Sequence, residues 1–545
     1  MTQNASTFIK QVTRSSDIRW RLAASAIANI FLISALLGQP FLIGSLISQI
    51  TSNAYADVRA KIVLLALLTG LAAVTAYAAA WINNSVLQDI RRDSKSLLYA
   101  SILPSPPLFF QHVNEGWIES AIATASQASR GIVHECLSVL IRALLFILLT
   151  TALIFLHYPL HGLVFFTAAS IYLFLAYHLA RNSAAGIHSA VAATVAASKE
   201  ASDMLANVDS IQQYDMVMHE EKRILGFLDA EKKIYRMAQS LLDRNDFLQK
   251  IYLTSLFIAF IFSVTIIADT RPQDAILFYI IGLLSYSQLD QVGKSLNSLF
   301  EQIHKLESVL GKIYFAPKEK HEKITHEIEH QLVEKITLEN ISFGYNPEKP
   351  IFNNFSLSIE PGSRHLICGP SGSGKSTLIR ILAGQIRPQS GRVLMNDRDS
   401  CALPLTEKIR RLTLIPQNAH LFNRSIHENA TYGVENVPYP DLEDLLLALR
   451  LDRLKRDGQG QWLDATVDRN GLNLSGGEKQ RIQLARAILH ARPMLLLDEA
   501  TSALDRETEA AVLKLLHERL PDAAIVAVSH HPHGELAGYQ ALVLN

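Results

Sequence analysis

The sequence has little cysteine and no excess of either charge, and each shortage excludes a class of protein. Its 545 residues include three cysteines, Cys136, Cys368 and Cys401, which are too few and too scattered for a disulfide framework or a zinc site. They fit a reduced, cytosolic setting for the soluble part of the chain. The 51 basic and 51 acidic side chains cancel, so no global field favours nucleic acid as a partner.

Charge is also scarce within six long apolar stretches. About 20 helical residues cross a bilayer, and such stretches lie near 22–47, 60–83, 136–157, 159–180, 250–268 and 273–293. Basic residues precede the first stretch as in a signal peptide, but its length and the five stretches after it favour an uncleaved membrane helix. Buried helices of a large soluble protein are the alternative, which six runs with so few charges disfavour. The sequence therefore predicts an all-α, six-helix transmembrane domain over 1–315.

The connections between these stretches differ in length and charge. Connections 84–135 and 181–249 are long and rich in lysine and arginine, whereas those near 157–159 and 269–272 are short. Because positive loops stay in the cytoplasm, we expect both termini there and the protein in the cell (inner) membrane. The long connections mix apolar and charged residues at helical spacing, which predicts two cytoplasmic extensions of the membrane helices.

The composition changes after the last apolar stretch. Residues 316–334 are predicted to be a linker, since Pro317 and the charges after it break the helical pattern. Over 335–545, short apolar and β-branched runs alternate with helical patterns, which predicts an α/β domain with a largely parallel sheet. The fold class is therefore a multidomain membrane protein, with a helical membrane domain and an α/β domain that binds nucleotide.

The nucleotide prediction rests on a glycine-rich segment that matches the pattern G-x-x-x-x-G-K-[ST], between an expected strand at 364–368 and an expected helix. Its glycines let backbone N–H groups converge on phosphates at a helix N-terminus. Lys375 adds a positive charge, and the Ser376 hydroxyl can ligate Mg²⁺. A glycine-rich turn is the alternative, which the complete pattern disfavours. The predicted ATP-binding residues are Gly369, Pro370, Ser371, Gly372, Ser373, Gly374, Lys375, Ser376 and Thr377, with ATP and Mg²⁺ as cofactors.

Two adjacent carboxylates, Asp498 and Glu499, end the apolar strand expected at 494–498. Successive side chains of a strand point to opposite faces, so the two carboxylates can have different roles. Asp498 is predicted to hold Mg²⁺, and Glu499 is predicted to polarise the attacking water. A solvated acidic pair is the alternative, which the phosphate loop upstream disfavours.

A third motif supplies a family resemblance. Residues 474–478, Leu-Ser-Gly-Gly-Glu, resemble the L-S-G-G-[QE] signature of the ATP-binding cassette (ABC) family. Small residues at a helix N-terminus suit anionic oxygen. The resemblance implies that Ser475, Gly476 and Gly477 contact ATP bound by a second half-transporter, in a homodimer or a heterodimer. It also implies that Tyr345 stacks on adenine, that Gln417 senses Mg²⁺ and water and contacts the membrane domain, that Asp505 belongs to the D-loop, and that His530 contacts the γ-phosphate.

These assignments give the predicted site. The catalytic set is Lys375, Gln417, Glu499 and His530, and the metal set is Ser376, Gln417 and Asp498. The whole chain resembles the exporter-type (type IV) fold, in which 109–130 and 207–214 are similar to the two coupling regions. It departs from the family pattern at 468–471, at Glu478, where glutamine is frequent, and at His531, where arginine is usual. We also expect the chain to lack the hairpin and helix that usually end the cassette.

The functional hypothesis is ATP-driven export of a hydrophobic or amphipathic solute, lipid or peptide by a dimeric translocase in the lipid bilayer. An importer on the same fold, of the siderophore or metallophore type, is one alternative, and a non-transporting regulator or sensor is another. Polar residues inside membrane spans are candidate substrate contacts, with snorkelling or interhelical hydrogen bonds as their alternatives. They are Gln39, Arg142, Arg181, Tyr286, Gln288 and Asp290, and Pro40 beside Gln39 is expected to kink the first span.

Overall fold

The computed structural model describes residues 3–51, 57–105, 109–110, 115–263, 272–314, 335–346, 348–403, 405–417, 420–456, 462–468, 471–529, 536 and 538–544. The chain divides into two compact units, one N-terminal and one C-terminal. The predicted linker, 316–334, lies outside the described residues.

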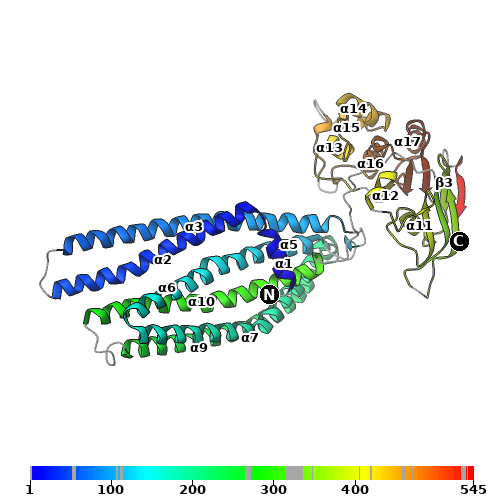
Figure 1. Ribbon diagram of the computed structural model, residues 1–545. Coiled ribbons are helices and arrows are strands. Elements are labelled where there is room, and N and C mark those ends of the chain that lie inside the picture. Colours follow the sequence, from blue (N-terminus) through cyan, green and yellow to red (C-terminus); the bar gives the residue numbers. More distant parts are fainter. Residues whose placement is uncertain are drawn as a thin grey trace. The chain divides into compact units, whose positions relative to one another are not determined.

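The N-terminal unit is helical (Figure 1). Its first helices are α1 (Gln3–Val12), α2 (Ser16–Thr51) and α3 (Val58–Ile102). A continuous helical stretch follows, formed by α5 (Glu115–His134), the π-helix η1 (Glu135–Ile141) and α6 (Arg142–His157). The unit ends with α7 (Pro159–Ala206), α8 (Val208–Gln213), α9 (Val217–Phe262) and α10 (Pro272–Ile313).

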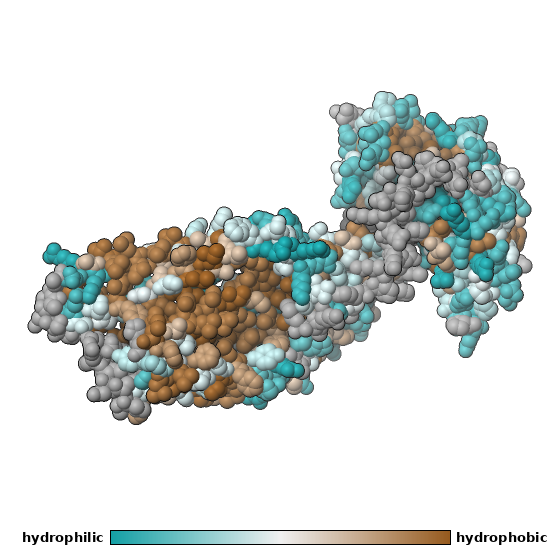
Figure 2. All heavy atoms as spheres, in the orientation of Figure 1, coloured by the Kyte–Doolittle hydropathy of each residue, from teal (hydrophilic) through white to brown (hydrophobic). Residues whose placement is uncertain are grey.

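Four helical stretches of the described residues are long and apolar enough to cross a membrane. They are Ser16–Ile50, Val58–Ile102, Gly116–Leu156 and Pro159–Ala206. They contain most or all of the first four predicted spans, and Figure 2 shows apolar side chains over much of this unit. Exposed leucines such as Leu67 and Leu71 suit contact with lipid, where no water opposes apolar surface. The fifth and sixth predicted spans fall on α9 and α10, beside residues outside the described set, so these two spans stay predictions.

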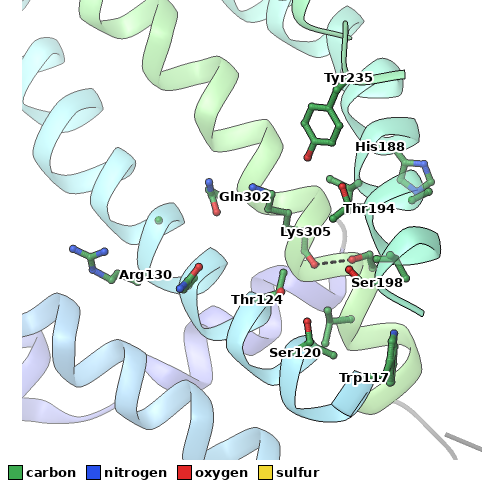
Figure 3. A pocket seen from close by; sticks show the side chains of 18 of the residues that line it. Trp117, Ser120, Thr124, Arg130, His188, Thr194, Ser198, Tyr235, Gln302 and Lys305 are labelled. Atoms are coloured by element: carbon green, nitrogen blue, oxygen red, sulfur yellow. Dashed lines mark hydrogen bonds between the residues drawn. The ribbon is translucent and has the colours of Figure 1, made fainter. Parts of the chain in front are cut away.

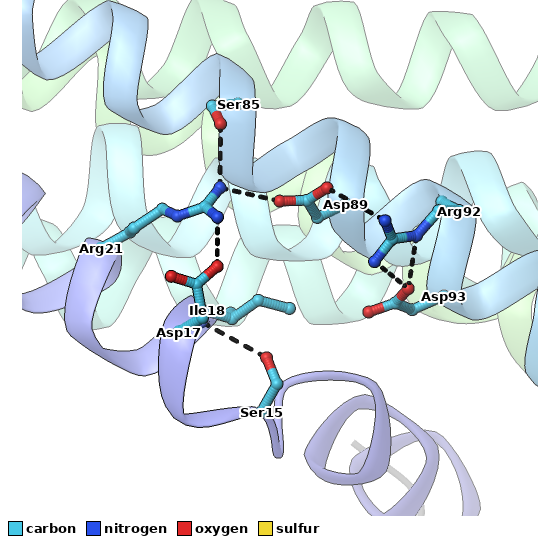
Figure 4. A network of polar contacts seen from close by, with 8 residues as sticks. All are labelled: Ser15, Asp17, Ile18, Arg21, Ser85, Asp89, Arg92 and Asp93. Atoms are coloured by element: carbon cyan, nitrogen blue, oxygen red, sulfur yellow. Dashed lines mark hydrogen bonds and ion pairs between the residues drawn. The ribbon is translucent and has the colours of Figure 1, made fainter.

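An ion pair joins the beginning of α2 to α3 (Figure 4). The Nη1 atom of Arg21 donates to Asp89 Oδ2 over 2.9 Å and to Ser85 Oγ over 3.0 Å. Asp17, one turn before Arg21, accepts from the same guanidinium. The charges are partly buried, which reduces their screening by water. The network therefore fixes how the first long helix leaves α1.

The C-terminal unit has the predicted α/β fold. An antiparallel sheet has the order β2 (Phe352–Ile359), β1 (Ile336–Phe343), β4 (Ser390–Met395) and β5 (Arg398–Asp399). A parallel sheet has the order β6 (Leu412–Ile415), β7 (Met494–Asp498), β8 (Ala524–Val528), β3 (Arg364–Cys368) and β9 (Gln540–Val543). Every residue of β7 and β8 is buried, as expected for central parallel strands.

Helices of the C-terminal unit are interspersed with its strands along the chain. They are α11 (Lys375–Leu382), α12 (Leu405–Arg411), α13 (Ile426–Ala430), α14 (Tyr439–Ala448), α15 (Asp452–Arg456), α16 (Gly476–His490) and α17 (Arg506–Arg519), with a 3₁₀ turn η3 (Trp462–Asp464) before α16. Both strands expected at 364–368 and 494–498 are present as β3 and β7.

Candidate functional site

Three of the four predicted catalytic residues, Lys375, Gln417 and Glu499, gather at one edge of the parallel sheet. Strands β3, β6 and β7 are parallel, so their carboxyl ends lie at the same edge. The phosphate loop follows β3, Gln417 follows β6, and Asp498 and Glu499 lie at the end of β7. Ligands of open α/β sheets bind at this edge. The strand order therefore brings together segments from distant parts of the chain.

The phosphate loop leads from β3 into α11 and needs its glycines. Gly372 and Gly374 have φ angles of 86° and 92°, in the left-handed region that glycine adopts without a Cβ clash. A Cβ on Gly374 would lie 2.4 Å from Ile351 Cγ2. Lys375 is buried, and its Nζ donates to the carbonyl oxygens of Gly369 and Pro370 over 2.8 and 2.9 Å. The ammonium group therefore lies over the loop that is predicted to hold phosphate.

Two predicted magnesium ligands contact each other. Ser376 Oγ donates to Asp498 Oδ1 over 3.0 Å. Burial raises the pKa of the Asp498 carboxyl, and the hydrogen bond from Ser376 partly opposes this effect. Hard cations such as Mg²⁺ take oxygen ligands. A hydroxyl and a carboxylate at hydrogen-bonding distance beside the phosphate loop fit that requirement.

Glu499 adopts an unusual backbone conformation directly after β7. Its φ angle is 51°, which is uncommon for a residue with a Cβ. Its carboxylate accepts a 2.6 Å hydrogen bond from Nε2 of Gln417. Strained residues of this kind concentrate at functional sites. Because the amide nitrogen faces Glu499, the Gln417 side-chain oxygen is left to contact water or a cation.

The predicted adenine contact, Tyr345, lies beside the helix of the phosphate loop. Its side chain is 61% exposed, and its ring meets that of Phe343 edge to face with centroids 5.2 Å apart. Thr377 Oγ1 donates to the Tyr345 hydroxyl over 3.5 Å. An exposed ring held in this way can stack on a planar base.

The signature motif forms the beginning of α16. Ser475 is the N-cap, and its Oγ accepts from the Glu478 N–H over 3.3 Å. The Glu478 carboxylate in turn accepts from the Ser475 N–H over 2.7 Å, which completes a capping box. A Cβ on Gly477 would lie 3.1 Å from the carbonyl oxygen of Ala503. The departure at Glu478 therefore has a structural role, because this buried side chain closes the cap.

Gln480 is a contact that the sequence interpretation missed. It is 4% exposed, and its Nε2 lies 3.5 Å from the Glu499 carbonyl oxygen and 3.4 Å from Ser502 Oγ. Its Oε1 accepts from the Ala503 N–H over 3.1 Å. The residue therefore ties the signature helix to the segment after Glu499. A glutamine within a helix gives no sequence signal for such a contact.

The structure does not place Asp505 or His530 among the contacts described above. Asp505 caps α17 by accepting from the Thr508 N–H over 3.0 Å, and this backbone hydrogen bond lowers the pKa of its carboxyl. Its contact with nucleotide stays a prediction. His530 lies outside the described residues, as do His531 and residues 469–470 of the unusual 468–471 segment.

Several predicted substrate contacts make polar interactions within the bundle. The Tyr286 hydroxyl lies 3.5 Å from Thr254 Oγ1, Asp290 pairs with Lys294 over 2.6 Å, and Arg142 donates to Gln291 over 3.1 Å. Pro40 lies inside α2. The second predicted coupling region contains α8, whose six residues are mostly exposed.

A large cavity lies in the membrane unit, and none of the polar candidates above lines it. Its volume is about 1010 Å³, and α3, α5, α7, α9 and α10 contribute residues (Figure 3). Its lining includes the basic side chains of Arg91, Arg130 and Lys305, and also His134 and His188. None of the described residues that line it is acidic. Lys305 is paired with Glu301 over 2.6 Å, so the excess positive charge of the lining comes from Arg91 and Arg130, and the cavity suits an anion better than a cation.

Comparisons with known proteins cover both units. Residues 22–311, more than half of the chain, match the family model "ABC transporter transmembrane region", and residues 352–502 match the model "ABC transporter". A solved bacterial Atm1-family ABC exporter with ATP bound has a TM-score of 0.88 and 22% identity, and the match covers 97% of this chain and 94% of that one. At this identity the match establishes a shared fold.

Curated relatives resemble shorter parts of the chain. It is 36% identical over 245 residues to the mitochondrial iron-sulfur clusters transporter ATM1 of Yarrowia lipolytica, over 45% of this chain and 33% of that protein. It is 36% identical over 196 residues to the ATM1-type heavy metal exporter of Novosphingobium aromaticivorans, over 36% and 32% of the two chains. The chain thus matches about a third of the length of these relatives.

Proposed function

The chain belongs to the ABC transporter family, and from that premise we propose that it is an ATP-hydrolysing half-transporter that acts as a dimer to export a solute. The observation that supports the proposal is that Ser376 contacts Asp498 and Gln417 contacts Glu499, so four residues predicted for ATP hydrolysis lie together in the same polypeptide as the membrane helices. The signature is present in this chain too, so a homodimer is sufficient. A heterodimer is the alternative.

In the proposed mechanism, ATP binds between the phosphate loop of one protomer and the signature of its partner. Lys375 and the N–H groups of the phosphate loop bind the phosphates of the nucleotide. The signature of the second protomer supplies Ser475 and Gly477 to the γ-phosphate. Each ATP therefore joins two cassettes, and the dimer closes only when nucleotide is bound.

Hydrolysis then depends on the two carboxylates. Asp498 and Ser376 would hold Mg²⁺, which when bound neutralises charge on the phosphates. Glu499 polarises the attacking water, and Gln417 holds the Glu499 carboxylate in place. Closure of the two cassettes moves the membrane helices, and hydrolysis resets the dimer. Both termini and the cassettes are proposed to be cytoplasmic, with the protein in the inner membrane.

The substrate proposal differs from the sequence-based hypothesis. The relatives are named for iron-sulfur clusters and heavy metal, and neither name supports a lipid or a peptide. Arg91 and Arg130 line the large cavity, and cationic side chains favour an anion over an apolar chain. We therefore propose a soluble, anionic metal complex or metal conjugate as the exported solute.

The test is transport by the purified protein in proteoliposomes. With the cassettes outside, added ATP should drive an anionic metal–thiolate complex into the vesicles, as measured by metal analysis of the lumen. The Glu499→Gln variant is the matched control and should give no ATP-dependent uptake. Movement only in the opposite direction would indicate an importer, and ATP hydrolysis without flux of any tested solute would favour a regulator.

A further inference from the structure

A second cavity of about 410 Å³ lies between α2 and α3 on one side and α5, η1 and α6 on the other. Polar groups line much of it, among them Asn29, Asn83, Asn84 and Ser138, and small alanines of α3 leave room beside them. Arg130 and His134 line this cavity and also the larger one. Both cavities therefore border these two side chains, and Figure 3 shows Arg130 at the margin of the larger cavity, away from Trp117 and His188.

The arginines of this second cavity lack a carboxylate partner among the described residues. The Nε atoms of Arg130 and Arg142 are buried and make no hydrogen bond there, although Arg142 Nη2 donates to Gln291 over 3.1 Å. The nearest acid in sequence, Glu135, instead accepts from Ser295 of α10 over 2.6 Å. Arg142 lies within a predicted membrane span, where a guanidinium without a counter-charge is costly and marks a functional site. Arg130 lies in a predicted cytoplasmic extension, where burial of a charge without a partner is also costly. A bound anion would supply the missing charge.

The π-helix η1 forms part of the same wall. Segments of π-helix are rare and are frequent at functional sites. Ser138 of η1 lines the cavity, and its Oγ accepts from Asn83 Nδ2 of α3 over 3.3 Å. Ser138 and Asn83 thus line the same cavity as the two guanidinium groups that lack a carboxylate partner among the described residues, and a hydroxyl and an amide can both hydrogen-bond to an oxyanion.

We propose that the second cavity is a relay site for an anionic group, which arrives from the larger cavity past Arg130 and His134. This inference rests on the proposed function, because it takes the larger cavity as the entrance for solute. The ligand chemistry is an oxyanion or a metal–thiolate anion. Either a soluble solute or the headgroup of an anionic lipid could supply that chemistry.

The test measures charge preference at the cavity wall. Cys136, Cys368 and Cys401 are replaced by serine, and Ser138→Cys is introduced for labelling in phosphatidylcholine nanodiscs. Rates are compared for an anionic sulfonatoethyl and a cationic trimethylammonioethyl methanethiosulfonate. The ratio of the two rates is normalised to that at Ser210→Cys, an exposed position of α8. Asn84→Cys is a second labelling position if Ser138→Cys does not fold.

The normalised ratio should favour the anionic reagent, and Arg130→Gln should lower it about three- to tenfold, as expected for loss of one charge several ångströms away. Arg244→Gln removes an exposed charge on α9 and should leave the ratio unchanged. An unchanged ratio in Arg130→Gln, or cysteines at both positions that react with neither reagent, would overturn the proposal.

Two further arms identify the source of the anion. Protection of the cysteine in discs that contain phosphatidylglycerol indicates a lipid headgroup. Protection by ethane-1,2-disulfonate at constant ionic strength indicates a soluble anion, and protection by neither overturns the proposal. Labelling needs no ATP, so it is independent of the transport assay: a normal charge preference without ATP-driven flux would refute the transport proposal alone.

Discussion

Gln417 and Glu499 lie 82 residues apart in the sequence, and the amide of Gln417 donates to the Glu499 carboxylate over 2.6 Å. The contact joins the segments that follow the neighbouring strands β6 and β7. The family resemblance assigns Gln417 a contact with the membrane domain. If it makes that contact, movement of this one side chain would release or restrain the carboxylate that polarises water.

Replacement of Glu499 by glutamine should stop turnover and spare ATP binding. The amide keeps the size of the side chain but cannot polarise water as a carboxylate does, so steady-state hydrolysis should fall about 100-fold or more. Phosphate release and binding of a fluorescent ATP analogue measure the two effects. Glu435→Gln, at an exposed position, should change neither quantity. Near-normal hydrolysis in Glu499→Gln would contradict the role of this residue.

Replacement of Lys375 by alanine should weaken nucleotide binding itself. The Nζ atom lies over the phosphate loop, where it is held by the carbonyl oxygens of Gly369 and Pro370. Loss of its charge should raise the Kd for ATP about tenfold or more, as measured by calorimetry. Lys514→Ala removes an exposed lysine as a control. An unchanged Kd in Lys375→Ala would show that the phosphate loop has been misinterpreted.

The stability of the nucleotide-free protein should depend on the protonation of Asp498. Burial raises the pKa of this carboxyl in the folded state above its ordinary value of 3.8. The protonated Asp498 carboxyl therefore contributes fully to the free energy of unfolding below pH 3.8. This contribution is lost as pH rises through the raised pKa of the folded state. Asp498→Asn should flatten this decline in thermal unfolding scans run without nucleotide.

Asp505 provides a control of opposite sign. The hydrogen bond from the Thr508 N–H lowers the pKa of the Asp505 carboxyl in the folded state. The ionised carboxylate therefore contributes to the free energy of unfolding above the ordinary pKa, and this contribution is lost as pH falls through the lowered pKa. Asp505→Asn should therefore reduce stability at neutral pH. If the unfolding temperature changed with pH in the same way in Asp498→Asn and Asp505→Asn, the opposite pKa shifts assigned to the two carboxyls would be contradicted.

Loss of Glu478 should destabilise the protein through the cap of α16. In Glu478→Ala the Ser475 N–H loses its acceptor, which costs about 1–2 kcal/mol. That cost should lower the unfolding temperature by about 2–8 °C in differential scanning fluorimetry. Glu478→Gln keeps an acceptor oxygen and should lower the unfolding temperature less than Glu478→Ala does. Glu428 lies in an equivalent capping box at α13 and is the matched control: Glu428→Ala should lower stability and leave ATP hydrolysis near normal.

The sequence alone determined the features that depend on local order. The glycines of the phosphate loop and signature, and the carboxylates after an apolar strand, are contiguous motifs whose chemistry follows from neighbouring residues. Four membrane spans and the α/β fold followed from hydropathy and periodicity in the same way. The fifth and sixth spans, the linker and His530 stay predictions.

Only the tertiary structure decided which distant residues meet. The contact between Ser376 and Asp498 depends on the strand order of the parallel sheet, and the contacts of Gln480 depend on how α16 packs on the next loop. Arg130 looked like an ordinary residue of a basic connection, yet helix packing places it between two cavities. A linear sequence contains no record of such contacts, because they arise when strands and helices from separate segments pack together.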